Sequence, residues 1–137
     1  MFRFCIVFCL WLLGVCDAAR AESLAERGGY LVNTIMACGN CHSPRDANGQ
    51  LIKEREFSGG LAFNTPAFTA TAPNITPDRE TGIGSWSDAE IKRAITQGLD
   101  KDGSRLKPPM GFGFYAKMTD GDLDDVIAWL RTLPPKE

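Results

Sequence analysis

The sequence predicts an all-α domain in which a few helices are joined by long loops. Three segments, residues 23–37, 87–98 and 119–133, show the apolar spacing of amphipathic helices. Residues 43–85 show no sustained periodicity and are interrupted by glycine and proline. A loop of that length is uncommon in a compact domain. We therefore expect it to wrap a large apolar group that supplies its packing partner.

The first predicted helix runs from Ser23 to about residue 37. Ser23 can cap its start, and Leu24, Leu31 and Ile35 fall on one helical stripe. This stripe is expected to face the core.

The second predicted helix has clear signals at both ends. Ser87 and Glu90 have the spacing of a capping box, and Gly98 is placed to end the helix.

The last helix is expected to begin at Thr119 and to end before Pro134. Its apolar positions follow the i, i+3, i+4, i+7 pattern: Leu123, Val126, Ile127 and Leu130.

Residues 1–21 have the features of a secretory signal peptide. Arg3 precedes an uncharged apolar run, and an A-x-A cleavage signal ends at Ala21. The run is shorter than the roughly 20 residues that a membrane-spanning helix needs. Cleavage would leave residues 22–137 as one exported, periplasmic domain with no membrane span. Lipidation at Cys16 is the alternative for this segment.

The composition excludes several classes of function. The 137 residues carry 15 basic and 17 acidic side chains, a balance that argues against a nucleic-acid-binding surface. The only histidine is His42. A hydrolytic triad or a histidine-rich metal site would have to be built on that single imidazole.

Cys38, Cys41 and His42 form a C-x-x-C-H motif, the attachment signature of c-type haem. Two thiols at this spacing can add to the two vinyl groups of one porphyrin. The adjacent imidazole is then held beneath the iron as its proximal ligand. The motif predicts one covalently attached haem.

Three other interpretations of the motif are weaker. A thioredoxin-like C-x-x-C needs a βαβ setting, which the sequence does not predict. A structural zinc site needs four ligands, and the exported segment offers two thiols and one imidazole. A plain disulfide would leave His42 unexplained.

The second axial ligand of the iron decides between an electron carrier and a ligand-binding haem. Met110 follows two prolines in a stiff turn and is the preferred ligand. Met118, which directly precedes the last helix, is the alternative, and an open site is the third possibility. Met36 is too close to Cys38 to reach across the ring. A thioether favours ferrous iron and closes the site, so electron transfer rather than catalysis is expected.

These residues resemble a class I c-type cytochrome. The resemblance runs from the first helix with Gly28 and Tyr30, through the C-x-x-C-H motif, to Met110 and the last helix with Trp129. More narrowly, several short segments are similar to the haem domains of cytochrome c subunits of membrane-bound alcohol and related dehydrogenases. Those segments are Gly59-Gly60, Asn74–Asp78, Thr81–Ser87, Pro109-Met110 and Met118–Asp120.

The resemblance implies a cytochrome c fold with haem on Cys38 and Cys41 and with His42 and Met110 as axial ligands. It also implies that Gly28 and Tyr30 pack against the helix face that carries Trp129. Two further roles are suggested in the shell around the haem. The Pro73 carbonyl would accept the imidazole N–H of His42. Trp86 would either donate its indole N–H to a haem propionate or serve as an ordinary core aromatic.

The resulting expectation is a mono-haem electron carrier, not an enzyme, that shuttles electrons from a dehydrogenase towards a terminal oxidase or other acceptor. A peroxidase-like enzyme or gas sensor with a labile sixth ligand is the alternative, and a haem-free thiol-disulfide protein is the third. Redox proteins are the expected partners. Basic residues flank Met110 and could steer an acidic partner face: Lys101, Arg105, Lys107 and Lys117.

Overall fold

The computed structural model of the chain describes residues 23–137, so the predicted signal peptide and Cys16 lie outside the described residues. The helices are α2 (Leu24–Tyr30), α3 (Gly39–His42), α4 (Asp88–Gln97), α5 (Phe112–Tyr115) and α6 (Asp120–Leu130), with a π-helical segment η1 (Leu31–Ile35) and a 3-10 turn η2 (Lys53–Arg55). No helix within the described range is long and apolar enough to cross a membrane.

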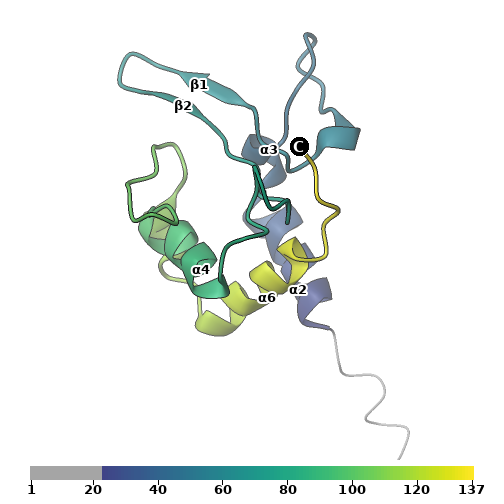
Figure 1. Cartoon of the computed structure of the whole chain (residues 1–137), viewed down its shortest axis with the longest axis vertical. Coiled ribbons are helices and arrows are strands. Elements are labelled where there is room, and N and C mark those ends of the chain that lie inside the picture. Colours follow the sequence, from purple (N-terminus) through teal and green to yellow (C-terminus); the bar gives the residue numbers. More distant parts are fainter. Residues whose placement is uncertain (1–22) are drawn as a thin grey trace, which may run out of the picture.

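The crossing of α2 and α6 forms the frame of the domain (Figure 1). Gly28 lies at the crossing, where a Cβ atom would overlap the carbonyl oxygen of Asp125. The next residue, Gly29, faces the Trp129 ring. The expected contact of Gly28 with this face of α6 is therefore present. Tyr30 is 55% exposed, and its expected packing on the same face stays a prediction.

Ion pairs hold the same two helices together at the edge of the crossing. The Arg27 guanidinium lies 2.5 Å from the Asp122 carboxylate and 3.0 Å from that of Asp125. The Asp125 side chain is only 7% exposed, so one of these pairs is largely shielded from water.

The predicted apolar stripe of the first helix is wrong in detail. Leu31 is buried as expected, but Leu24 and Ile35 are 63% and 62% exposed, and Val32 is fully buried instead. For Ile35 the cause is η1, in which the amide of residue 36 donates to the carbonyl of Leu31, whereas Leu24 lies before this turn and is exposed within α2. A π-helical turn contains an extra residue, so the positions after it leave the phase of an α-helix.

The starts of α2, α4 and α6 and the end of α4 agree with the sequence, whereas the first helix, expected to run to about residue 37, ends as α2 at Tyr30 and continues as η1. Ser23 forms a capping box at the start of α2, and Ser87 forms one with Glu90 at the start of α4. Gly98 ends α4 in the left-handed conformation at φ 65°, and Thr119 caps α6. These elements pack through one core of buried residues: Leu31, Val32, Phe57, Ile83, Ile91, Ile95, Leu123, Val126, Ile127 and Leu130.

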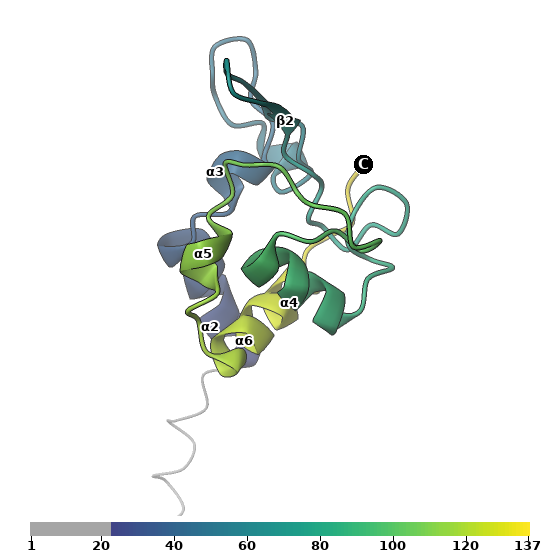
Figure 2. The same cartoon turned by 90° about the vertical axis from the view of Figure 1, so that its left-hand side faces the viewer.

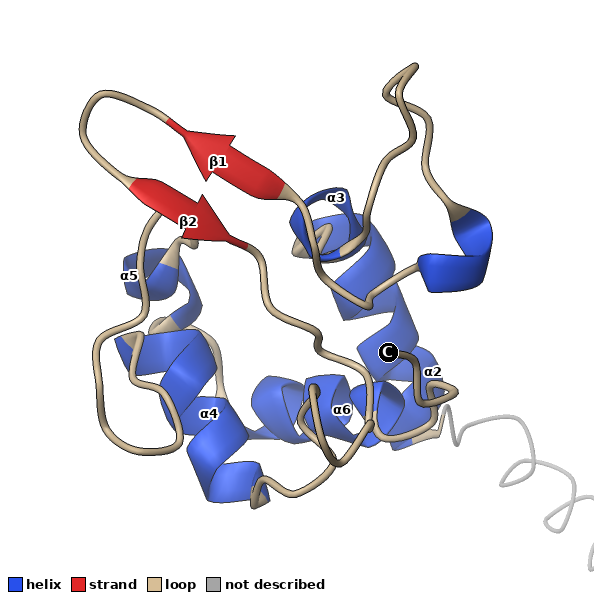
Figure 3. Ribbon diagram, turned by 45° about the horizontal axis from the view of Figure 1, so that its top comes forward, coloured by secondary structure: helices blue, strands red, loops and turns tan. Residues whose placement is uncertain are grey.

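The long segment before α4 contains structure that the sequence did not predict. Strands β1 (Ala62–Asn64) and β2 (Thr69–Thr71) form a short antiparallel hairpin in which Phe63 pairs with Ala70. Figure 3 shows this hairpin standing over the helical part of the molecule. Three-residue strands are too short to show an alternating pattern in the sequence. The fold is otherwise helical with long loops, as predicted.

The segment after the hairpin is fixed by the C-terminal end of the described chain. The Asn74 side-chain amide donates to the carbonyl oxygen of Lys136 at 2.5 Å, and the Lys136 amide donates to the Thr76 hydroxyl at 3.1 Å. Asn74 also accepts the Thr76 amide at 2.9 Å. These bonds hold the backbone immediately after Pro73.

Candidate functional site

A cavity of about 580 Å³ opens between α3, the hairpin and the segment that leads into α5. Its lining comes mainly from residues within 36–42, 69–73 and 105–112. Figure 2 shows the last of these segments running from the α4 side of the molecule towards α3. Five predicted site residues line this one cavity: Cys38, Cys41, His42, Pro73 and Met110.

The C-x-x-C-H motif occupies one turn of helix. The backbone breaks at Ala37, which adopts φ 50°, and α3 then brings the amide of His42 to the carbonyl of Cys38 at 2.9 Å. Cys38 is partly buried, Cys41 is exposed, and neither forms a disulfide. Burial raises the pKa of the Cys38 thiol to about 11. Because neither thiol is in a disulfide and both line the cavity, both are available at its wall.

His42 is held in one orientation and one tautomer. Its Nδ1 atom lies 2.9 Å from the Pro73 carbonyl oxygen. Because a carbonyl oxygen only accepts, Nδ1 carries the proton, and the lone pair on Nε2 is left for a metal. Burial lowers the pKa of His42, and the bond to Pro73 opposes that effect. The contact that the resemblance implied between Pro73 and His42 is present.

Met110 lines the same cavity from a different segment of the chain. Two bonds fix this segment. The Leu106 amide donates to the Gly98 carbonyl at 2.9 Å, and the Lys107 ammonium donates to the Thr69 carbonyl at 3.1 Å. Met118, the alternative ligand, lies outside the cavity and packs against the core.

Trp86 is not brought together with the other predicted site residues. It lies outside the cavity and packs against the core, and its carbonyl accepts the Arg131 guanidinium at 2.6 Å. Its contact with a propionate stays a prediction. The cavity also has lining residues that the sequence did not assign to the site, among them Phe112 and Tyr115. Their position two and five residues after Met110 is the only signal that could have suggested them.

The residues present fit a haem. The volume lies within the range of about 300–1,000 Å³ that ligand cavities have. Much of the wall is apolar, with Phe63, Leu106 and Phe112 facing the cavity. Two thiols, an imidazole with its Nε2 lone pair available and a thioether are the donor set of a c-type haem with histidine and methionine ligands.

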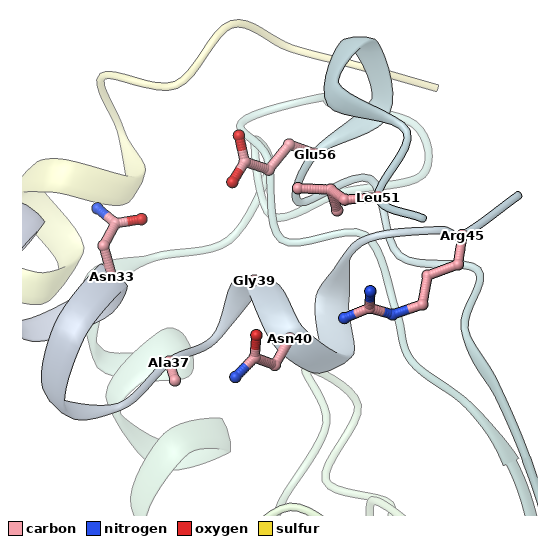
Figure 4. A pocket seen from close by; sticks show the side chains of 7 residues that line it. All are labelled: Asn33, Ala37, Gly39, Asn40, Arg45, Leu51 and Glu56. Carbon is pink, nitrogen blue, oxygen red and sulfur yellow. The ribbon is translucent and has the colours of Figure 1, made fainter. Parts of the chain in front are cut away.

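A second cavity lies on the other side of the motif helix but does not fit such a group. It measures about 110 Å³ and contains no thiol, imidazole or thioether. Figure 4 shows its polar side chains, including Asn33, Asn40 and Arg45. Arg45 donates to the Gly49 carbonyl at 3.1 Å. The larger cavity is therefore the candidate site.

A helical fold around a cavity with these donors is that of a haem-binding domain. Comparison with known proteins agrees: residues 25–134 match the family model described as cytochrome c. The chain belongs to the cytochrome c family. Haem c is covalently bound in this family, and the domain is an electron-transfer unit rather than a catalytic one.

Several curated proteins are similar to this chain. The cytochrome c subunit of gluconate 2-dehydrogenase from Pantoea cypripedii is 36% identical over 113 residues, which cover 82% of this chain and 24% of that protein. The cytochrome c subunit of a quinone-type alcohol dehydrogenase from Gluconacetobacter polyoxogenes is 34% identical over 108 residues, covering 79% and 21%. A diheme cytochrome c-type protein from Cereibacter sphaeroides is 33% identical over 121 residues, covering 88% and 38%. The chain thus spans well under half the length of these relatives.

Proposed function

We propose that this chain is a periplasmic mono-haem cytochrome that accepts electrons from a dehydrogenase and passes them towards a terminal oxidase or other acceptor. The haem is attached to Cys38 and Cys41, and His42 and Met110 are the axial ligands. Two of the similar proteins are named as cytochrome c subunits of gluconate and alcohol dehydrogenases, which supports a dehydrogenase as the donor.

The observation that carries this proposal is the placement of His42 and Met110 on separate segments that line one cavity. A bound haem c supplies reversible one-electron chemistry at its iron. The protein's part is to fix the ligands. Pro73 orients the imidazole, and the bonds of Leu106 and Lys107 hold the segment that carries Met110. His42 and Met110 would hold the iron from separate segments and would leave no position on it for a substrate.

The alternative of a haem enzyme or gas sensor requires a sixth position that is open or easily vacated. No observation favours it, because Met110 lines the cavity within a segment that is anchored at two points. The thiol-disulfide alternative does not account for the large cavity beside the motif.

The experiment is to produce the full chain in a host that attaches haem to exported cytochromes. We expect one haem per chain, retained after denaturing electrophoresis, and reversible reduction and reoxidation of the purified protein. A variant with both Cys38→Ser and Cys41→Ser should lose the covalent haem. A colourless wild-type protein made in such a host would contradict the proposal.

A further inference from the structure

The charged side chains that line the cavity are not used by the proposed axial ligands. They are Asp100, Arg105 and Lys107, two cations and one anion. All three belong to the loop between α4 and α5, and none belongs to the motif helix. Figures 1 and 3 show the part of this loop that follows α4 well apart from α3.

The backbone of the loop places Arg105 at the cavity. Arg105 pairs with Leu99 in an isolated antiparallel bridge, and the Asp100 amide donates to the Ser104 carbonyl at 2.8 Å. The residue after it, Leu106, is bonded to Gly98 at the end of α4. The guanidinium itself has no hydrogen-bond or ion-pair partner among residues 23–137.

Lys107 and Asp100 differ from Arg105 in that the side chain of each forms a hydrogen bond within the protein. The Lys107 ammonium donates one of its three hydrogens to Thr69 on β2, which leaves two for another acceptor. The Asp100 carboxylate accepts the amide of Lys101 at 2.6 Å. The cavity therefore presents an excess of one positive charge on its loop side.

The chemistry of haem identifies an acceptor for these cations. Its two propionate carboxylates lie on the half of the ring remote from the two vinyl groups. Thioether bonds at Cys38 and Cys41 would fix the vinyl half beside α3, so the propionates would point away from α3. Carboxylates in a cavity need partners, and a guanidinium is the best matched of them.

We propose that Arg105 and Lys107 bind the haem propionates and so set the orientation of the ring within the cavity. This assignment rests on the proposed function. The thiols and the axial ligands keep their proposed roles. The bond to a propionate, which the sequence suggested for Trp86, is made by the α4–α5 loop instead. Arg105 and Lys107 are then binding residues and not, in the first place, part of a surface that steers a partner.

The test is the midpoint potential of the haem protein across the neutral pH range. Cations beside a propionate favour its ionised form, so Arg105→Gln should move the pH-dependent step of the potential upward by roughly one pH unit. Lys107→Gln should move it in the same direction. Lys117→Gln is the matched control because it removes one charge from an exposed residue outside the cavity.

Each outcome is decisive. A profile of Arg105→Gln that superimposes on the wild type, or a Lys117→Gln profile that moves equally far, would overturn the assignment. If Arg105→Gln yields no haem protein, Arg105→Lys should give the wild-type pH profile of the potential, and Lys107→Gln should still shift that profile. If neither result is obtained, the proposal is contradicted. A wild-type chain without haem would instead contradict the proposed function.

Discussion

The Nδ1–H group of His42 donates a hydrogen bond to the carbonyl oxygen of Pro73 at 2.9 Å, across 31 positions of sequence. This bond joins the motif helix to the segment that follows β2. The same segment is held by Asn74, whose side chain reaches the C-terminal residues. The orientation of the proximal imidazole therefore depends on contacts made far from the C-x-x-C-H motif.

Asn74→Ala tests that dependence. Asn74 is 8% exposed and bonds to Thr76, Thr81 and Lys136. Its removal leaves buried polar groups without partners, so we expect a loss of about 2 kcal/mol in the free energy of unfolding. Urea unfolding measures this loss. Asn48→Ala, at an exposed turn, is the control and should change little; equal losses in the two variants would contradict the account.

Gly28→Ala should weaken the crossing of α2 and α6. The added methyl group would meet the carbonyl oxygen of Asp125, which belongs to a helix and cannot yield freely. Overpacking of this kind costs roughly 1–3 kcal/mol, and we expect the upper end. The comparison is Gly113→Ala, where a methyl group meets nothing within 4 Å. Thermal unfolding of the two variants should differ clearly.

Val32→Ala and Ile35→Ala distinguish the observed helix face from the predicted stripe. Val32 is fully buried and Ile35 is 62% exposed. Truncating Val32 should cost about 2 kcal/mol, whereas truncating Ile35 should cost less than about 0.5 kcal/mol. Denaturant titration measures both. A larger loss for Ile35→Ala would mean that the helix keeps the regular stripe and that η1 does not form.

Asp122 should make the α2–α6 contact sensitive to acid. Hydrogen bonds from Arg27 and then from Thr119 hold the pKa of its carboxyl below the usual value. Because the folded-state pKa is the lower one, this stabilisation is complete above the unfolded value of about 3.9 and is lost as pH falls through the folded value.

The measurement is the urea midpoint of the wild type and of Asp122→Asn as the pH is lowered. The wild type should lose stability below about pH 4, and the variant should show a smaller loss over the same interval. Glu54→Gln, at the exposed turn η2, should follow the wild-type curve. If the urea midpoint falls with pH equally steeply in Asp122→Asn and in the wild type, the contact of Asp122 does not contribute to the acid sensitivity.

The local signals in the sequence were sufficient for the starts of α2, α4 and α6 and for the end of α4. Ser87, Gly98 and Thr119 act through their own backbone neighbours, and the spacing of Cys38, Cys41 and His42 is itself the chemical requirement. Features that depend on tertiary packing could not be predicted from the sequence. The π-helical turn that exposes Ile35 and the position of Trp86 against the core follow from tertiary contacts.

The hairpin and the loop cations show the same limit. Strands of three residues carry too little pattern to be recognised. The sequence placed Arg105 and Lys107 beside Met110 and suggested a surface role for them. Only the fold shows that both line the cavity while Lys117 does not. Arg105 and Lys107 share a cavity with the motif helix although they are far from it in the sequence.

Carbon monoxide tests the central claim most directly, because it binds ferrous haem only where an axial position is open. The visible spectrum of the reduced protein is recorded before and after the gas is added. We expect no change for the wild type and for Met118→Ala, and a shifted spectrum for Met110→Ala. A shift in the wild-type protein would contradict a site closed by His42 and Met110, and would favour a haem enzyme or gas sensor instead.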